Sequence, residues 1–397
     1  MTATVCATAL PAPLLPGATL GVLGGGQLGR MFVHAAQALG YDTAVLDPDP
    51  ASPAGRISHH HVQAGYDSTE GLATLARLCN AITTEFENVP AASLTALAAQ
   101  RPVAPGASAV AVAQDRVQEK AHFDRCGVPC APYAAIDSEA ALAALPAGLL
   151  PGILKTVRMG YDGKGQVRVA SAAELAAAWA SVGSVPCVLE KMLPLALECS
   201  VIVARGRDGA LVSLPVQRNL HQGGILAVTE VYEDNVPPAL AALALAATKS
   251  IAHGLDYVGV LCVEFFVLQD GTLVVNEIAP RPHNSGHYSQ NACDVSQFEL
   301  QVRTLAGLPL VQPRQHSAAV MLNLLGDLWF AGGSDDNART PAWDAVLALP
   351  GTHLHLYGKA EAKRGRKMGH LNVTAATAAQ ARSTALQAAA LLGLPAF

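Results

Sequence analysis

The sequence predicts an α/β domain at the N-terminal end of the chain and α+β segments with β-hairpins in the remainder. Residues 19–47 read as strand, glycine-rich turn, helix and strand, which is how a parallel α/β domain begins. From residue 151 onward, short apolar strands separated by tight turns replace this alternation. The chain has 397 residues, of which 51% are hydrophobic and 14% charged. It can therefore bury more than one core, and we expect three domains.

The N-terminal α/β domain is expected to span residues 17–115, after a flexible tail over residues 1–16. The pattern predicts a helix over 69–80, a strand over 81–86 and a helix over 89–100. The run His59-His60-His61 lacks the Cys or carboxylate spacing of a metal site, so we interpret it as a solvated loop. The tail is apolar but lacks the basic residues that precede the apolar core of a secretory signal.

The second region is expected to span residues 116–310 and to contain a lid subdomain over about 151–222. Residues 116–150 read as helical and connecting. Strands are predicted over 152–156, 165–170, 186–192, 200–206 and 210–216, with an Ala-rich helix over 170–181. A helix over 238–253 precedes two strong strands, 259–268 and 272–279, which we expect to form a hairpin. In the C-terminal segment, 311–397, strands are predicted over 320–326, 353–359 and 369–374, before a helix over 376–391.

Composition excludes several classes of protein. The net charge is −5 and no long basic run is present, so a nucleic-acid surface or an anionic membrane surface is not expected. No uninterrupted apolar run approaches the roughly 20 residues that span a bilayer. The eight cysteines lie mostly in apolar segments, which favours buried thiols in a reducing cytoplasm. Cys126 and Cys130 have no second Cys or His pair that would complete a metal site.

The first turn carries a glycine pattern. Gly24, Gly26 and Gly29 match G-x-G-x-x-G after a strand, and Asp47 ends the next strand, which is the form of a dinucleotide site. An NAD-dependent oxidoreductase is therefore one hypothesis. The same turn could instead bind one phosphate or the polar edge of a mononucleotide, or it could be a tight turn without a ligand.

A second glycine loop, GYDGKGQ at 160–166, lies between two predicted strands, and Lys155 lies on the first of them. Backbone N–H groups and one ammonium group could fold over the phosphates of a nucleotide. The loop is not a Walker A motif, because it leads into a strand and lacks the Gly-Lys-Ser/Thr ending. The alternative is an ordinary hairpin turn.

Two carboxylates lie on the strongest predicted hairpin. Glu264 and Glu277 are each flanked by apolar residues, and carboxylates seldom occupy such positions unless they share a partner. A Mg²⁺ ion that also contacts ATP phosphates would hold both, whereas the alternative is two separate surface carboxylates. The loop after Glu277 carries Arg281, His283 and Asn284, which suit a small planar anion such as bicarbonate. A structural loop satisfied by its own side chains is the alternative.

A local cationic cluster occurs late in the chain, in KAEAKRGRKMGHLN at 359–372. Lys359 and Arg366 could bind a phosphate group, or the cluster could be a solvated basic turn.

These motifs, in this order, resemble the 5-(carboxyamino)imidazole ribonucleotide synthetase family of ATP-grasp enzymes in purine biosynthesis. The resemblance runs from about residue 19 to about residue 374 and depends on GGGQLGRM, TTEFENVP, QDRVQEK, GYDGKGQ, NEIAPRPHNSGHYSQNAC and GRKMGHLN. It implies an ATP-grasp fold with an N-terminal parallel α/β domain like that of biotin carboxylase. It also implies an ATP-dependent carbon–nitrogen ligase, a cytoplasmic homodimer that uses Mg²⁺ and carboxylates 5-aminoimidazole ribonucleotide with bicarbonate through carboxyphosphate.

The resemblance also implies which residues contact each ligand. The Mg²⁺ ligands would be Glu264 and Glu277, and the bicarbonate pocket would be Arg281, His283 and Asn284. Lys155 and Asp162 are candidates for catalysis, Lys155 at the phosphates and Asp162 at the amine proton. The ATP-binding residues would be Arg116, Lys155, Gly160, Tyr161, Asp162, Gly163, Lys164, Gly165, Gln166, Glu190, Lys191, Met192, Leu193, Glu198, His221, Asn276 and Glu277. The ribonucleotide-binding residues would be Gly25, Gln27, Glu85, Tyr161, Lys359 and Arg366.

The sequence departs from the family pattern at two places. His221-Gln222-Gly223-Gly224 lacks the acidic residue of the family's His-Lys-Asp-Gly, and Lys363-Arg364-Gly365-Arg366 replaces Arg-Pro-Gly-Arg. The second change keeps the charge but puts a rigid turn in doubt. Rival hypotheses are a formate-using purine transformylase, a biotin-dependent carboxylase and a nucleotide-binding regulatory protein without turnover. The loop at 281–287 and the late cationic cluster separate this family from the two rival enzymes.

Overall fold

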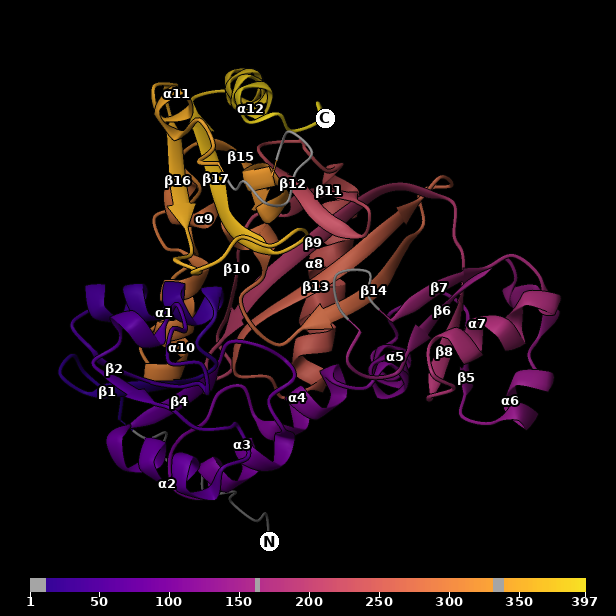
Figure 1. Cartoon of the computed structure of the whole chain (residues 1–397), viewed down its shortest axis with the longest axis horizontal. Helices are drawn as coiled ribbons and strands as arrows, with labels where there is room; N and C mark the ends of the chain where they lie inside the picture. Colours follow the sequence, from indigo (N-terminus) through magenta and orange to yellow (C-terminus); the bar gives the residue numbers. More distant parts are fainter. Residues whose placement is uncertain (1–11, 161–164, 331–338) are drawn as a thin grey trace, which may run out of the picture.

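The computed structural model describes residues 12–160, 165–330 and 339–397. The described part of the chain contains three sheets, and Figure 1 shows them as three regions around a common centre. The N-terminal region is parallel α/β, and the other two sheets are largely or wholly antiparallel. The predicted combination of an α/β domain with α+β segments is therefore confirmed.

The N-terminal sheet has the strand order β3-β2-β1-β4, and all its pairs are parallel. Apolar clusters cover both faces, one built on Leu20, Val22 and Phe32 and the other on Leu46, Leu75 and Ile82. Burial on both faces agrees with the strands themselves, because every residue of β4 and every residue of β1 after Thr19 is buried. Its strands are β1 (Thr19–Leu23), β2 (Asp42–Leu46), β3 (His60–Val62) and β4 (Ala81–Thr84), and its helices are α1 (Gln27–Ala38), α2 (Thr69–Leu78), α3 (Ala91–Ala98) and α4 (Ala107–Ala113).

A small antiparallel sheet with the order β5-β8-β6-β7 forms the second region, at the right of Figure 1. Helices α6 and α7 lie beside it, and Leu154, Leu175 and Leu189 are part of its core. Its strands are β5 (Tyr133–Ile136), β6 (Gly152–Thr156), β7 (Gln166–Val169) and β8 (Cys187–Lys191), and helices α5 (Arg116–Arg125), α6 (Glu139–Ala143) and α7 (Leu175–Ser181) belong to the same stretch of chain.

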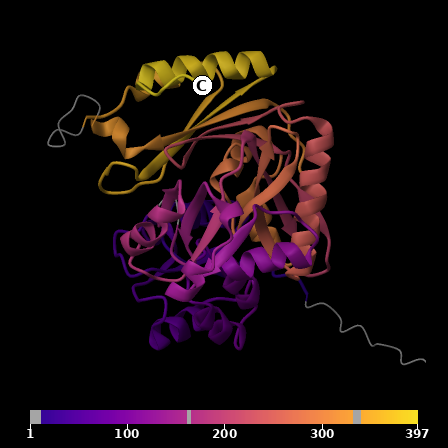
Figure 2. The same cartoon turned by 90° about the vertical axis from the view of Figure 1, so that its right-hand side faces the viewer.

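The largest sheet runs β14-β13-β9-β11-β12-β15-β17-β16, with β10 paired to β9. Helix α8 packs on β9 and β13 on one face, and α10 packs on the same strands and also on α1. The C-terminal helix α12 covers β15 and β17, as Figure 2 shows. The strands are β9 (Leu195–Arg205), β10 (Leu211–Ser213), β11 (Gln217–Gln222), β12 (Ile225–Val231), β13 (Gly259–Leu268), β14 (Leu273–Ala279), β15 (Ala318–Leu325), β16 (Thr352–Leu356) and β17 (Lys367–Ala375), and the helices are α8 (Pro238–Gly254), α9 (Ser289–Ala292), α10 (Gln297–Ala306), α11 (Trp343–Leu347) and α12 (Ala378–Leu392).

Several elements differ from the prediction. His60 and His61 belong to β3, an edge strand, so their interpretation as loop residues is wrong, although His60 is exposed as expected. The hairpin of β11 and β12 was not predicted, because Gln217 and Asn219 occupy the buried positions of β11 and remove its apolar alternation. Strand β5 and helix α10 were also missed. None of the helices in the described ranges is both long and apolar enough to cross a membrane.

Candidate active site

The three regions enclose one large cavity of about 1240 Å³. It gathers side chains from the N-terminal domain, the small sheet, the large sheet and the loop before β17. Gly25 is buried and is not among its lining residues, and Tyr161, Asp162, Gly163 and Lys164 lie outside the described residues. The lining includes Gln27, Glu85, Arg116, Lys155, Gly160, Gly165, Gln166, Glu190, Lys191, Met192, Leu193, Glu198, His221, Glu264, Asn276, Glu277, Arg281, His283, Asn284, Lys359 and Arg366.

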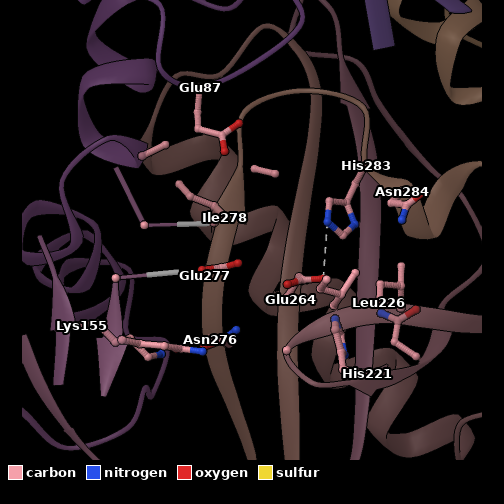
Figure 3. Close-up of a pocket in the computed structure, with 18 of the residues that line it drawn as sticks. Glu87, Lys155, His221, Leu226, Glu264, Asn276, Glu277, Ile278, His283 and Asn284 are labelled. Carbon is pink, nitrogen blue, oxygen red and sulfur yellow. Dashed lines mark ion pairs between the residues drawn. The ribbon is translucent and has the colours of Figure 1, made fainter. Parts of the chain in front are cut away.

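The two carboxylates of the β13-β14 hairpin are direct cross-strand partners, and both face the cavity (Figure 3). Glu277 pairs with Arg116 at 3.1 Å, and His283 Nε2 lies 3.6 Å from Glu264 Oε1. Burial, together with the charge of Glu277, raises the pKa of Glu264 to about 7. The alternative of two separate surface carboxylates is therefore wrong.

A buried ion-pair triad lies between α5 and the small sheet. The carboxylate of Glu190 on β8 pairs with Lys155 Nζ at 2.9 Å and with Lys120 Nζ at 3.0 Å. Lys155 lies on β6, directly opposite β8, so sheet register brings the pair together. Although burial opposes it, the two lysines lower the pKa of Glu190 to about 2. The triad carries a net positive charge next to the loop that begins at Gly160, which suits a phosphate group.

The loop after β14 holds its polar groups in a fixed arrangement. Arg281 Nε donates to Glu87 Oε2 at 2.5 Å, and Gln297 binds the backbone N–H and carbonyl of His283. Burial, reinforced by the Arg281 charge, keeps the pKa of His283 well below its usual value, so its imidazole is neutral at pH 7. Both polar atoms of the Asn284 side chain are buried without a hydrogen-bond partner among the described residues. A bound polar ligand would satisfy them.

The first glycine turn does not present its N–H groups to a ligand. Gly26 N and Gly29 N donate to the two oxygens of Glu85, at 2.5 and 2.6 Å, and Gly25 N donates to Asp47 at 2.7 Å. A side-chain carboxylate therefore occupies the place at the N-terminus of α1 where a dinucleotide pyrophosphate would bind. Asp47 is buried and also accepts from a tyrosine hydroxyl, so it is not placed to bind a ribose. The NAD hypothesis is wrong.

The late cationic cluster borders the cavity, although Lys363 and Arg364 in its turn are exposed to solvent. Lys359 Nζ donates to Gln27 Oε1 at 2.6 Å, which joins this loop to the start of α1. The cluster also supplies Lys363, Arg364 and Lys367 to the lining, three residues that sequence reasoning did not select. The turn that was in doubt does form, because Arg366 N donates to Lys363 O at 3.0 Å and Gly365 adopts a positive φ of 70°.

The other departure from the family pattern has a structural reason. Gly223 and Gly224 connect β11 to β12 as a two-residue turn with φ of 60° and 82°, which is the geometry that favours glycine. His221, just before the turn, hydrogen bonds to Glu198 at 2.6 Å. Although burial opposes it, this bond raises the pKa of His221.

Comparisons with known proteins agree with this arrangement. A model of the ribonucleotide synthetase preATP-grasp domain matches residues 17–114, and one of the ATP-grasp domain matches residues 121–298. A third, of the phosphoribosylaminoimidazole carboxylase C-terminal domain, matches residues 319–384. The N5-carboxyaminoimidazole ribonucleotide synthase of Brucella melitensis is 45% identical, over 90% of this chain and 96% of that protein. The corresponding protein of Pseudomonas aeruginosa is 40% identical, over 94% and 99%.

The chain belongs to the N5-carboxyaminoimidazole ribonucleotide synthase family.

Solved structures of this family have the same fold. The Aspergillus clavatus enzyme in complex with ADP and 5-aminoimidazole ribonucleotide matches with a TM-score of 0.86 and 32% identity, over 95% of this chain and 99% of that one. The Staphylococcus aureus enzyme in complex with ADP matches with a TM-score of 0.85 and 36% identity, over 95% and 98%. The ATP-grasp fold with its N-terminal parallel domain is therefore confirmed, as is the predicted assignment to an ATP-dependent ligase family.

Sequence reasoning missed three charged residues of the site, of which Glu87 and Glu119 line the cavity and Lys120 lies behind the lining. Lys120 completes the triad, and Glu119 accepts from Ile278 N at 2.7 Å, next to Glu277. Glu87 binds Arg281. The only signal for the first two was their place in the motif QDRVQEK, and for Glu87 its place in TTEFENVP. Charged residues on a predicted helix or loop are ordinarily solvated, so neither motif indicated a buried partner.

Proposed function

We propose that this chain, an ATP-dependent ligase, carboxylates the exocyclic amine of 5-aminoimidazole ribonucleotide with bicarbonate, through carboxyphosphate. The observation that carries the proposal is the position of the Arg281–His283–Asn284 loop. It lies in one cavity with both the Glu264–Glu277 pair and the Gln27–Lys359 contact. A site for a small planar anion in the same cavity as a nucleotide phosphate site and a second phosphate site fits a three-substrate ligase.

Mg²⁺ fits the β13-β14 carboxylates. Glu264 Oε1 is buried without a hydrogen-bond partner in the described part of the chain, and Glu277 lies directly opposite. Oxygen ligands are what Mg²⁺ prefers, and a divalent cation would offset both the burial and the Glu277 charge that raise the pKa of Glu264. No group of three or more His, Cys, Asp or Glu suited to a metal occurs in the described ranges, so ATP phosphates and water would complete the coordination. The ion would neutralise charge on the transferring phosphoryl group.

In the first step, an oxygen of bicarbonate attacks the γ-phosphorus of ATP, the bond to the bridging oxygen breaks, and ADP leaves. No enzyme nucleophile is required, so the residues act by positioning and charge neutralisation. Lys155 and Arg116 would bind the ATP phosphates. Arg281 would bind two oxygens of bicarbonate, and the neutral His283 and the Asn284 amide would orient it.

In the second step, the amine nitrogen attacks the carbonyl carbon of carboxyphosphate, the carbon–oxygen bond to the phosphate breaks, and the amine loses a proton. Lys359 and Arg366 would hold the 5′-phosphate of the ribonucleotide. Gln27 and Glu85 would lie near the ribose of the same molecule. Asp162, the candidate for the amine proton, lies outside the described residues. A closed site would keep water from the labile acyl phosphate.

A homodimer and a reducing, cytoplasmic setting stay predictions. The setting is supported by the thiols of Cys79, Cys126, Cys130, Cys187, Cys199, Cys262 and Cys293, all of which are unpaired. Burial raises the pKa of both the Cys79 and the Cys199 thiol to about 12, which makes them poor nucleophiles.

The substitution Arg281→Lys tests the function. It preserves the charge but not the fork that grips two oxygens, so it should lower the coupled rate by about 30- to 1000-fold, equivalent to about 2–4 kcal/mol. ADP release and ribonucleotide carboxylation are measured at varied bicarbonate, with ATP binding checked by calorimetry. ATP affinity should barely change. A Lys variant with wild-type kcat and bicarbonate dependence would refute the pocket assignment.

The rival ligases are tested with the unaltered protein. If ADP release depends on both bicarbonate and 5-aminoimidazole ribonucleotide, a transformylase and a biotin-dependent carboxylase are excluded. Dependence on formate or biotin instead would overturn the proposal, and the absence of any turnover would favour a regulatory nucleotide-binding protein.

A further inference from the structure

One ion pair joins the N-terminal domain to the loop that the proposed function assigns to bicarbonate. Glu87 follows β4 in the N-terminal domain, and Arg281 follows β14 in the large sheet. Arg281 Nε donates to Glu87 Oε2 at 2.5 Å across 194 positions of sequence. Both side chains line the cavity but are mostly buried, with 18% of the Arg281 side chain and 24% of the Glu87 side chain exposed. A pair of this kind is shielded from water more than a surface salt bridge.

The contact fixes the guanidinium of Arg281. Its Nε is bound by Glu87, and its Nη1 donates to the carbonyl of Pro282 at 3.1 Å. The backbone is held as well, because Arg281 N donates to Ala279 O at 2.8 Å. These two hydrogen bonds restrict rotation about the side-chain bonds of Arg281. The direction of the remaining N–H groups of its guanidinium is therefore fixed.

Glu87 is itself held firmly. The carbonyl of Glu87 and that of Val89 both accept from Gln114 Nε2 at 2.6 Å, which braces the loop after β4 against the end of α4. Although burial opposes it, the Arg281 guanidinium lowers the pKa of Glu87, so the carboxylate is ionised at pH 7. The positive charge of Arg281 is thus balanced before any substrate anion arrives.

The same short loop carries two carboxylates with different partners. Glu85 binds the glycine turn at the start of α1, beside Gln27, whereas Glu87 binds Arg281 two residues later. One end of the segment therefore lies against the proposed ribonucleotide subsite and the other against the proposed bicarbonate subsite. The backbone between Glu85 and Glu87 therefore connects the two proposed subsites, and Gln114 holds it at Glu87.

We propose that Glu87 is a positioning residue that orients Arg281 for bicarbonate and links its placement to occupancy of the ribonucleotide subsite. The inference deepens the proposed function and depends on it. Glu87 touches no reacting atom in this scheme. Its effect is to hold the Arg281 fork where carboxyphosphate forms, and to hold it best when the ribonucleotide is in place, so that ATP is not consumed without a carboxyl acceptor.

The test compares Glu87→Gln and Glu87→Asp with a matched control. Gln keeps an oxygen acceptor but loses the charge, and Asp keeps the charge but withdraws it by one methylene. The control is Glu299→Gln, which removes the charge from a carboxylate that also binds an arginine, Arg303 at 2.6 Å, within α10. Three quantities are measured for each protein: the KM for bicarbonate, the KM for ATP, and the ratio of ADP released to ribonucleotide carboxylated.

Glu87→Gln is expected to raise the bicarbonate KM by about 10- to 100-fold, the loss typical of one charge-assisted hydrogen bond, and to raise the ADP-to-product ratio above that of the wild type. The ATP KM should stay within about twofold. Glu87→Asp should give intermediate values, and it serves as the test if the Gln variant is poorly folded. The control should match the wild type in all three quantities.

A purely structural role gives a different result, because partial misfolding lowers kcat while leaving both KM values and the ratio unchanged. That outcome, or wild-type values in both Glu87 variants, would overturn the inference. Failure of the proposed function is distinguishable, because it would appear in the unaltered protein as ADP release that ignores bicarbonate and 5-aminoimidazole ribonucleotide.

Discussion

Replacing Glu190 by Gln removes a carboxylate that pairs with two buried ammonium groups, those of Lys120 and Lys155. Lys120 is 1% exposed and Glu190 is 4% exposed, so bulk water does little to screen the charges that remain. At a separation of roughly 6 Å and an effective dielectric constant of about 20, two like charges repel by about 3 kcal/mol. Removing one partner of a buried ion pair generally costs about 3–5 kcal/mol. We therefore expect Glu190→Gln to destabilise the small sheet by about 3–5 kcal/mol.

The chain provides its own reporter for this measurement. Trp179 lies on α7 beside the small sheet, and its indole N–H donates to Val185 O at 2.8 Å. Trp329 and Trp343 pack on each other in the C-terminal region. Urea unfolding followed by fluorescence in a Trp329→Phe/Trp343→Phe background would thus report mainly on the small sheet, and the shift of its midpoint gives the free-energy change.

A second substitution decides whether charge is the cause. Lys120→Met in the Glu190→Gln background removes the excess ammonium and should recover most of the lost stability, since Lys155 keeps an amide acceptor. If Glu190→Gln leaves the midpoint unchanged, or if the double variant is no more stable than the single one, the carboxylate of Glu190 does not offset repulsion between the two lysines. Recovery without loss of the helix signal at 222 nm would separate charge repulsion from misfolding.

Three other predictions concern the metal carboxylates, the cationic cluster and pH. Glu264→Gln and Glu277→Gln should each lose nearly all turnover yet keep the fold, because they balance a charge that is present only with Mg·ATP, and unchanged Mg²⁺ dependence in both would remove the assignment. Arg366→Ala should raise the KM of the ribonucleotide and leave that of ATP near normal; an equal rise for both substrates would contradict a 5′-phosphate contact. Burial raises the pKa of Glu119 to about 8 from an ordinary value of 4.5, so the folded protein holds this proton longer than the unfolded chain. Stability of the ligand-free protein should therefore fall as pH rises from 4.5 to 8, by on the order of 4 kcal/mol from this group. Glu119→Gln should flatten the decline in Tm, and an equal slope in that variant would show that another group is responsible.

Most elements of the fold could be predicted because the composition of each segment is typical of the structure it forms. The β13-β14 hairpin is nearly continuous apolar sequence around a short turn, and α7 and α12 are Ala-rich helices. Strand β11 could not be predicted, because Ser200, Gln217, Asn219 and Thr229 form a buried hydrogen-bonded group across β9, β11 and β12. Their polarity resembles that of a loop until the partners on neighbouring strands are known.

The sequence by itself determined the order of the motifs, and with it the family, the ATP-grasp fold and many of the charged residues that line the cavity. Each motif lies within a single turn or strand, so residue types and their spacing along the chain are enough to recognise it. Pairing between distant segments could not be determined in this way. Only the tertiary structure decided that Glu85 occupies the glycine turn of the apparent dinucleotide motif, that Lys120 and Lys155 share Glu190, and that Glu87 holds Arg281. Each of these contacts joins side chains from different elements, and a buried charge is stable only where the fold brings its partner within hydrogen-bond distance.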